Sequence, residues 1–227
     1  MIDDTLKDTT IYIGDFIIHQ PVTVFTDYII TILCFYFFRK LHISAFIDKS
    51  TLNWKRFFLF LGFASFFGGS SHGFFAVHQG VGYKFFWLTM QALNVFAIYS
   101  AQKATLHSAL KNSDKKQFWN LSYKIQFILF FVAVFVFQNF SVVILNSIIG
   151  LVPIMIIHFI DAKKEKESAW IAYGIVVLFI TALVNATRFS LHAYFNYLDI
   201  AHVLIMINLS LMFVGIKRKA ISSQLGV

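Results

Sequence analysis

The chain has 227 residues, of which 58% are hydrophobic and only 13% are charged. Soluble domains carry about 25% charged residues, so this composition excludes a soluble globular domain and indicates an integral membrane protein. The basic excess, 19 Lys and Arg against 11 Asp and Glu, is typical of the cytoplasmic loops of such a protein and does not indicate a nucleic-acid partner.

Seven apolar stretches are close to the length of about 20 residues that a membrane-spanning helix needs. In chain order they are residues 22–38, 57–77, 85–104, 121–137, 140–160, 169–189 and 198–216. No linker is long enough to separate two domains. We therefore predict an all-α fold, a single seven-helix transmembrane domain over residues 1–227.

The basic residues fall mainly on one side of this predicted bundle. Fifteen follow the first, third, fifth and seventh spans, whereas only Lys7, Lys84 and Arg188 lie on the opposite side. Basic loops stay in the cytoplasm, so the N-terminus is expected outside and the C-terminus inside. The expected location is the plasma membrane, the inner membrane of a bacterium, with membrane lipids as partners.

Polar side chains recur in one layer near the outer ends of five spans. They are Asp27, His72, Gln91, Asn94, Asn185, Arg188, Asp199 and His202. At 1.5 Å per helical residue, most of them lie within roughly 10 Å of the outer boundary. A charge at membrane depth costs roughly 2.5 to 3.5 kcal/mol on insertion scales, so these groups are expected to face the bundle interior.

Spacing places several of these groups on shared helix faces. Ser65, Gly68 and Gly69 share a face with His72, and such small residues let another helix approach closely. Three residues apart, Asp199 and His202 point the same way. We expect the seventh span to pack against the second and to bring His202 to His72.

Two histidines and a carboxylate are adequate zinc ligands, and bound zinc makes hydrolysis accessible at neutral pH. His72 and His202 are the candidate ligands, with Asp199 as a third ligand or as the group that orients a histidine. Asp27 is the candidate general base. Asn94, Arg188 and Gln91 are the candidate contacts to a substrate head group or developing oxyanion. Ligation needs neutral histidine, so metal affinity should fall below about pH 6.5.

Other interpretations of the same polar layer stay open. The groups could be interhelical hydrogen bonds worth about 0.6 kcal/mol each. They could bind or sense a lipid or small ligand without chemistry, through Asp27, Asn94 and Arg188. His72 and His202 could also hold a haem. A retinal protein is disfavoured, because the seventh span has no lysine before Lys217.

Three segments, "PVTVFTD", "GGSSHGF" and "FNYLDIAHVL", resemble the signature blocks of an uncharacterised family of small bacterial seven-helix membrane proteins. More remotely, the layout is similar to the superfamily of alkaline ceramidases and progestin/adiponectin receptors. That resemblance implies a zinc-dependent hydrolase acting on a lipid amide or ester. Its motif is Ser-x-x-x-His in span two, an acid shortly after, and His-x-x-x-His in span seven.

The chain departs from that superfamily motif at three places. Gly68 stands where the serine would be, Leu198 stands where the first span-seven histidine would be, and no acid follows His72. The resemblance then implies that Ser65, Asp27 and Asp199 act as substitutes. On this basis Ser65, Asp27 and Asp199 are the candidate catalytic residues.

Overall fold

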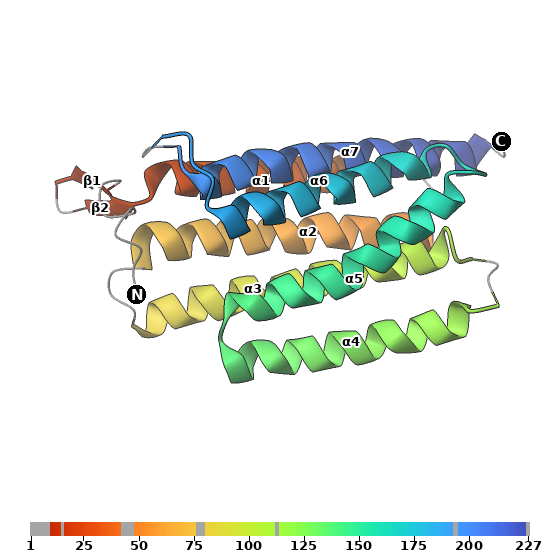
Figure 1. Ribbon diagram of the computed structural model, residues 1–227, viewed down its shortest axis with the longest axis horizontal. Coiled ribbons are helices and arrows are strands. Elements are labelled where there is room, and N and C mark those ends of the chain that lie inside the picture. The colour runs from red at the N-terminus through yellow and green to blue at the C-terminus, as the bar shows by residue number, and fades with distance from the viewer. Residues whose placement is uncertain are drawn as a thin grey trace.

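A computed structural model describes residues 10–14, 16–41, 48–75, 80–111, 114–192 and 195–225. It consists of a short β-hairpin followed by seven long helices that lie side by side (Figure 1). The elements are β1 (Thr10–Ile13), β2 (Phe16–His19), α1 (Pro21–Lys40), α2 (Lys49–Ser70), the π-helical segment η2 (Ser71–Phe75), α3 (Val81–His107), α4 (Lys116–Phe137), α5 (Phe140–Asp161), α6 (Ser168–Thr187) and α7 (Tyr197–Leu225). The predicted all-α architecture fits this arrangement.

The two ends of the bundle differ in the elements that they carry. The hairpin end carries β1 and β2 and the first residues of α1, α3, α5 and α7 (Figure 1). The opposite end, here called the lysine-rich end, carries the first residues of α2, α4 and α6 and the last residues of α7.

The hairpin was not predicted from the sequence. Thr10 pairs with His19 and Ile13 with Phe16 in antiparallel register. Gly14 at the turn has a φ of +60°, a conformation that glycine adopts without steric cost. Two β-prone runs separated by Gly-Asp are a recognised hairpin pattern, so the sequence did contain the information.

Each predicted span overlaps one of the seven helices, and the largest differences in length are at the start of α2 and the end of α7. α2 begins at Lys49 rather than at 57, because the Asp48 side chain caps it by accepting from the Thr51 N–H at 2.7 Å. α7 continues to Leu225 rather than stopping at 216. The predicted end of the second span at 77 lies outside the described residues.

Six helices are long and apolar enough to cross a membrane, which is consistent with a multi-pass membrane protein. They are Pro21–Lys40, Lys49–Phe75, Lys116–Phe137, Phe140–Asp161, Ser168–Thr187 and Tyr197–Ser222. In the described part of the chain, α3 falls outside this group. It is packed between α2, α4 and α5, and it buries amides there: Gln102 donates to Gln126 of α4 at 2.7 Å, and Gln126 donates to Asn146 of α5 at 2.8 Å.

The centre of the bundle is an apolar core built from every helix except α4. Its buried members include Ile30, Cys34, Phe58, Leu209 and Met212. The Phe37 and Phe213 rings stack across α1 and α7 with centroids 4.2 Å apart. α4 lies along one edge of the bundle (Figure 1), and its buried residues are Tyr123 and Val134.

The contact between α6 and α7 depends on a glycine. A Cβ added at Gly174 would lie 2.6 Å from Cγ of Met212 and 2.9 Å from the backbone oxygen of Asn208. A side chain can move aside, but the backbone of α7 moves only with the whole helix. Gly174 therefore sets how closely α6 and α7 approach.

We predict that Gly174→Ala lowers the free energy of unfolding by about 1–3 kcal/mol, the usual cost of overpacking. The matched control is Gly68→Ala, whose new Cβ would meet Cγ of Met90 at an ordinary 3.5 Å. Thermal unfolding in detergent, followed by circular dichroism, measures both variants. Equal stability of the two variants would contradict the packing argument.

Candidate functional site

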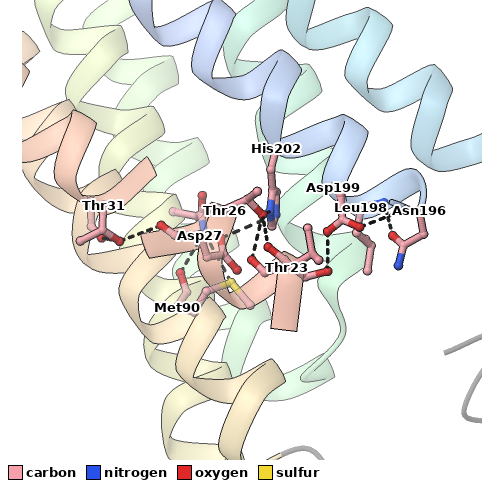
Figure 2. A network of polar contacts seen from close by, with 12 residues as sticks. Thr23, Thr26, Asp27, Thr31, Met90, Asn196, Leu198, Asp199 and His202 are labelled. Atoms are coloured by element: carbon pink, nitrogen blue, oxygen red, sulfur yellow. Dashed lines mark hydrogen bonds and ion pairs between the residues drawn. The ribbon is translucent and has the colours of Figure 1, made fainter. Parts of the chain in front are cut away.

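Polar side chains of α1 and α7 meet near the hairpin end of the bundle (Figure 2). Thr23, Thr26 and Asp27 lie in the first two turns of α1, and Asp199 and His202 lie in the first two turns of α7. Thr23, Asp27 and Asp199 are buried. The two helices therefore present their polar faces to each other, as the low polarity of lipid requires.

Asp199 connects the start of α7 to α1. Its Oδ1 accepts a hydrogen bond from the Thr23 hydroxyl at 2.8 Å, and its Oδ2 accepts from the Asn196 backbone N–H at 2.9 Å. The second bond resembles a capping box, in which an acid in the first turn satisfies a free N–H at the helix start. Both carboxylate oxygens of Asp199 thus already have protein donors.

His202 is held by Thr26 through one ring nitrogen. The single hydroxyl hydrogen of Thr26 is directed at the backbone oxygens of Thr23, at 2.9 Å, and Val22, at 3.0 Å. The Thr26 oxygen also lies 2.7 Å from His202 Nδ1, so Thr26 holds the His202 ring whichever ring nitrogen carries the hydrogen.

The other ring nitrogen of His202 faces Asp27. Nε2 lies 3.6 Å from Oδ1 of Asp27, and the two side chains are 14% and 9% exposed. With the hydrogen on Nδ1, Nε2 presents a lone pair to the carboxylate, and a metal ion can then bind between the two atoms. With the hydrogen on Nε2, His202 faces Asp27 as a donor.

Glycines of α2 make room for the Asp27 carboxylate. A Cβ at Gly69 would lie 2.9 Å from Cβ of Asp27, and one at Gly68 would lie 3.8 Å from its Oδ2. The Thr31 hydroxyl also donates to the backbone oxygen of Gly62 at 3.2 Å. The small face of the second span was expected to receive the seventh span, but α1 is the helix that packs there.

His72 belongs to the π-helical segment that ends the second span. Its ring meets the Trp87 ring edge to face, with centroids 6.2 Å apart. His72 and His202 lie within range of each other's charge, although the structure gives no direct contact between them. π-Helical turns are rare in proteins, but those that occur are often found at functional sites, because they redirect the side chains that follow.

The remaining residues that were predicted to act in the site are not in contact with the Asp27–His202 pair in the described structure. Gln91 is buried, and its amide fits its surroundings with the nitrogen toward Asn139 and the oxygen toward Trp87. In this orientation the nitrogen donates to the Asn139 backbone oxygen at 3.1 Å, and the oxygen accepts from Trp87 Nε1 at 2.6 Å. Asn94 donates to the Met90 backbone oxygen of its own helix at 3.0 Å. Half-buried Ser65 is seven residues before His72, and Arg188 is exposed where α6 ends.

The structure bears on the zinc prediction only indirectly. Among the described residues, no group of three or more His, Cys, Asp or Glu side chains lies close enough together to hold a metal ion. The two groups nearest each other are Asp27 and His202, whereas both oxygens of Asp199 are bonded elsewhere. Zinc binding by His72, His202 and Asp199 stays a prediction.

Three residues of this region were missed by the sequence reasoning. Thr23 and Thr26 position Asp199 and His202, and the four-residue steps from Thr23 to Asp27 and Thr31 indicate a polar face on the first span. Ser71, next to His72, is fully buried and its Oγ has no hydrogen-bond partner among the described residues. A serine in an apolar run carries no spacing pattern that would single it out.

We predict that Thr23→Val lowers the free energy of unfolding by about 1–3 kcal/mol, because it leaves a buried carboxylate oxygen of Asp199 without its donor. Thr23→Ser should keep most of the stability. Thr187→Val is the control, since the exposed Thr187 hydroxyl bonds only to the backbone of its own helix. Chemical or thermal unfolding in detergent measures all three, and equal losses for Thr23→Val and Thr187→Val would contradict the assignment.

The geometry can be set beside known proteins. Comparison with curated proteins and with solved structures gives no match. A family model described as "Family of unknown function (DUF6962)" matches residues 22–221, which cover the seven helices apart from Pro21 and the last four residues of α7 and include every residue of the Asp27–His202 region. The chain therefore belongs to this family of unknown function, DUF6962.

Proposed function

We propose that the protein is a membrane-embedded, metal-dependent hydrolase of a lipid amide or ester, with its site at the hairpin end. The observation that carries the proposal is the approach of Nε2 of His202 to Oδ1 of Asp27, 3.6 Å apart, with the two side chains 14% and 9% exposed. With Thr26 accepting the Nδ1 hydrogen, the Nε2 lone pair would be available as a metal ligand.

The donor set of this pair suits zinc. Two ligands at about 2.0–2.2 Å from a tetrahedral zinc lie about 3.4 Å apart, close to the observed separation. Asp27 and His202 would hold the ion, with His72 as the third ligand after a change of its side-chain rotamer. Asp27 takes this role in place of Asp199, whose oxygens bond to Thr23 and Asn196.

Zinc bound there would lower the pKa of a coordinated water to about 7 and polarise a carbonyl. The chain's own residues supply the rest of the site. Thr26 fixes the orientation and tautomer of His202, a role that second-shell partners of metal-binding histidines commonly have. The Asp199 bonds to Thr23 hold α7 against α1 and so keep His202 beside Asp27.

The location of the pair supports a lipid as the substrate. Asp27 is six residues from the start of α1 and His202 five from the start of α7, so both lie roughly 8–9 Å along their helices. This is near the level at which lipid head groups meet the acyl chains. With the lysine-rich end in the cytoplasm, the site would face the outer leaflet of a bacterial inner membrane.

Metal content tests the proposed ligands. Purified protein supplied with zinc should hold about one ion per chain at pH 7.5, and Asp27→Asn and His202→Ala should each lose it. His107→Ala, which removes a histidine at the lysine-rich end, should keep it. Lowering the pH to 5 should release the ion from the wild type, because protons compete for histidine. Folded wild-type protein without zinc, or unchanged zinc in both ligand variants, would overturn the proposal.

The role of Thr26 gives a second prediction. Thr26→Val removes the acceptor for the Nδ1–H of His202, so zinc affinity and hydrolysis should fall by about 10–100-fold. Thr26→Ser keeps the oxygen and should retain both. Competition with a chelator of known affinity measures the zinc, and release of free fatty acid from an N-acyl lipid and from a fatty-acid ester in mixed micelles measures the reaction.

A non-enzymatic lipid-binding or sensing protein is the second candidate. The lack of a three-ligand metal group among the described residues favours it. In that case a proton, rather than a metal ion, lies between His202 and Asp27, and the polar pair contacts a head group. The two candidates differ in outcome: a binding protein returns the N-acyl lipid intact after incubation, whereas a hydrolase releases its fatty acid.

A further inference from the structure

Basic side chains from three helices gather at the lysine-rich end, far from the Asp27–His202 pair. Here they are called the cationic cluster, and its members are Lys49 of α2, Lys103 and His107 of α3, and Lys116 and Lys124 of α4. On α4, Lys116 and Lys124 lie one turn on either side of Asn120, which bonds to Lys103 of α3 at 2.7 Å. On α3, His107 lies one turn from Lys103, and Ser50, next to Lys49, donates to the Ala104 backbone oxygen at 2.9 Å. Like charges held this close destabilise one another unless an anion lies among them.

Hydrogen bonds fix part of the cationic cluster in place. The Lys103 ammonium donates to Oδ1 of Asn120 on α4 at 2.7 Å, and the Lys116 ammonium donates to the Lys111 backbone oxygen at 3.2 Å. Lys103 and Lys116 are half-buried, whereas Lys124 and Lys49 are exposed. The ammonium groups therefore lie on both sides of the junction between α3 and α4.

Acidic side chains do little to neutralise the cationic cluster. Asp48 acts on His107, but its carboxylate accepts from the N–H and the hydroxyl of Thr51 at the start of α2. Within the described residues, Lys103, Lys116 and Lys124 form no ion pair with a carboxylate. Lys219 at the same end is different, because it pairs with both Asp161 and Glu165.

The start of α4 adds to the positive potential. α4 begins at Lys116, and the side chain of its N-cap residue, Lys115, does not cap the first backbone N–H groups of the helix. Free N–H groups and the helix dipole attract anions at such a terminus. The lysines and the terminus thus act on the same small region of the surface.

The surface next to the cationic cluster suits acyl chains. Starting one turn beyond Lys116, the outward face of α4 exposes Leu121, Ile125, Ile128 and Val132. A phospholipid whose phosphate sits among the lysines would lay its chains along this face. The cationic cluster and the exposed apolar face of α4 therefore follow one another along the surface, as the phosphate and the acyl chains do in a phospholipid.

We propose that the cationic cluster is a binding site for the phosphate of an anionic phospholipid in the membrane leaflet at the lysine-rich end. The carrying observations are the convergence of Lys103, Lys116 and Lys124 on one helix junction, their lack of carboxylate partners within the described residues, and the exposed apolar face of α4 beside them. This site is independent of the proposed hydrolase.

Native mass spectrometry of the full chain from mixed micelles tests the site, with phosphatidylglycerol and phosphatidylcholine as probes. Wild-type protein should retain phosphatidylglycerol in preference to phosphatidylcholine. The double variant Lys103→Gln with Lys124→Gln should reduce that preference by about fivefold for each lysine removed. This factor corresponds to about 1 kcal/mol of binding free energy per cation. Lys163→Gln with Lys164→Gln removes two exposed charges from the same end and is the matched control. Lys103→Arg with Lys124→Arg should bind as the wild type does.

The outcomes separate the alternatives. Loss of preference in the glutamine pair, with the control pair and the arginine pair unchanged, supports the site. An equal loss in the control pair means that only total charge matters and overturns it. Preferential binding that inorganic phosphate abolishes at equal concentration overturns the assignment to a lipid. Thermal unfolding shows whether the glutamine pair is folded, and Lys116→Gln alone repeats the test if it is not.

Discussion

The contact of α1 with its two neighbours determines the geometry of the candidate site. On one side, Gly62, Gly69 and Gly73 of α2 and η2 leave space that α1 fills with Cys34, Asp27 and Val24. On the other side, Thr23 and Thr26 bond to Asp199 and His202 of α7. A larger residue at Gly69 would displace Asp27, and the His202 Nε2 contact would then be lost.

Satisfied hydrogen bonds explain why the bundle can bury so many polar groups at one end. Lipid offers no hydrogen-bond partners, so a buried carboxylate must find donors within the protein. Asp199 meets this requirement with two ordinary donors, and its role is to join two helices. Asp27 differs from Asp199, because the nearest ring nitrogen of His202 lies 3.6 Å from its Oδ1, beyond hydrogen-bond distance.

The sequence was most informative where a single physical property dominates. Apolar length located the seven helices, although α3 is not among the six that are long and apolar enough to cross a membrane. It was less informative about polar helix extensions such as Lys49–Arg56, since a cap at Asp48 and packing of Trp54 extend α2 beyond its apolar stretch. The hairpin was missed, although its turn pattern was present.

For the site, residue type and depth identified Asp27, Asp199 and His202 as polar groups at one level of the bundle. They did not show which of these side chains would be in contact with each other. The assignment of partners depends on which helices are neighbours, and spacing along one helix does not contain that information. Gly68 and Gly69 indicated a close helix contact, yet α1 and α7 were equally compatible with the pattern. The partner of the Gln91 amide could not be predicted either, because the Asn139 backbone oxygen lies in a turn far away in the sequence.

The apolar core has a consequence for exchange between the two membrane faces. Ile30, Cys34, Phe58, Leu209 and Met212 form a closely packed layer between the Asp27–His202 pair and the lysine-rich end. Hydrated ions and head groups do not dissolve in such a layer. Under the proposed function, a ligand held beside Asp27 would therefore enter and leave from the hairpin end, and the lysine-rich end would be separated from it by this core.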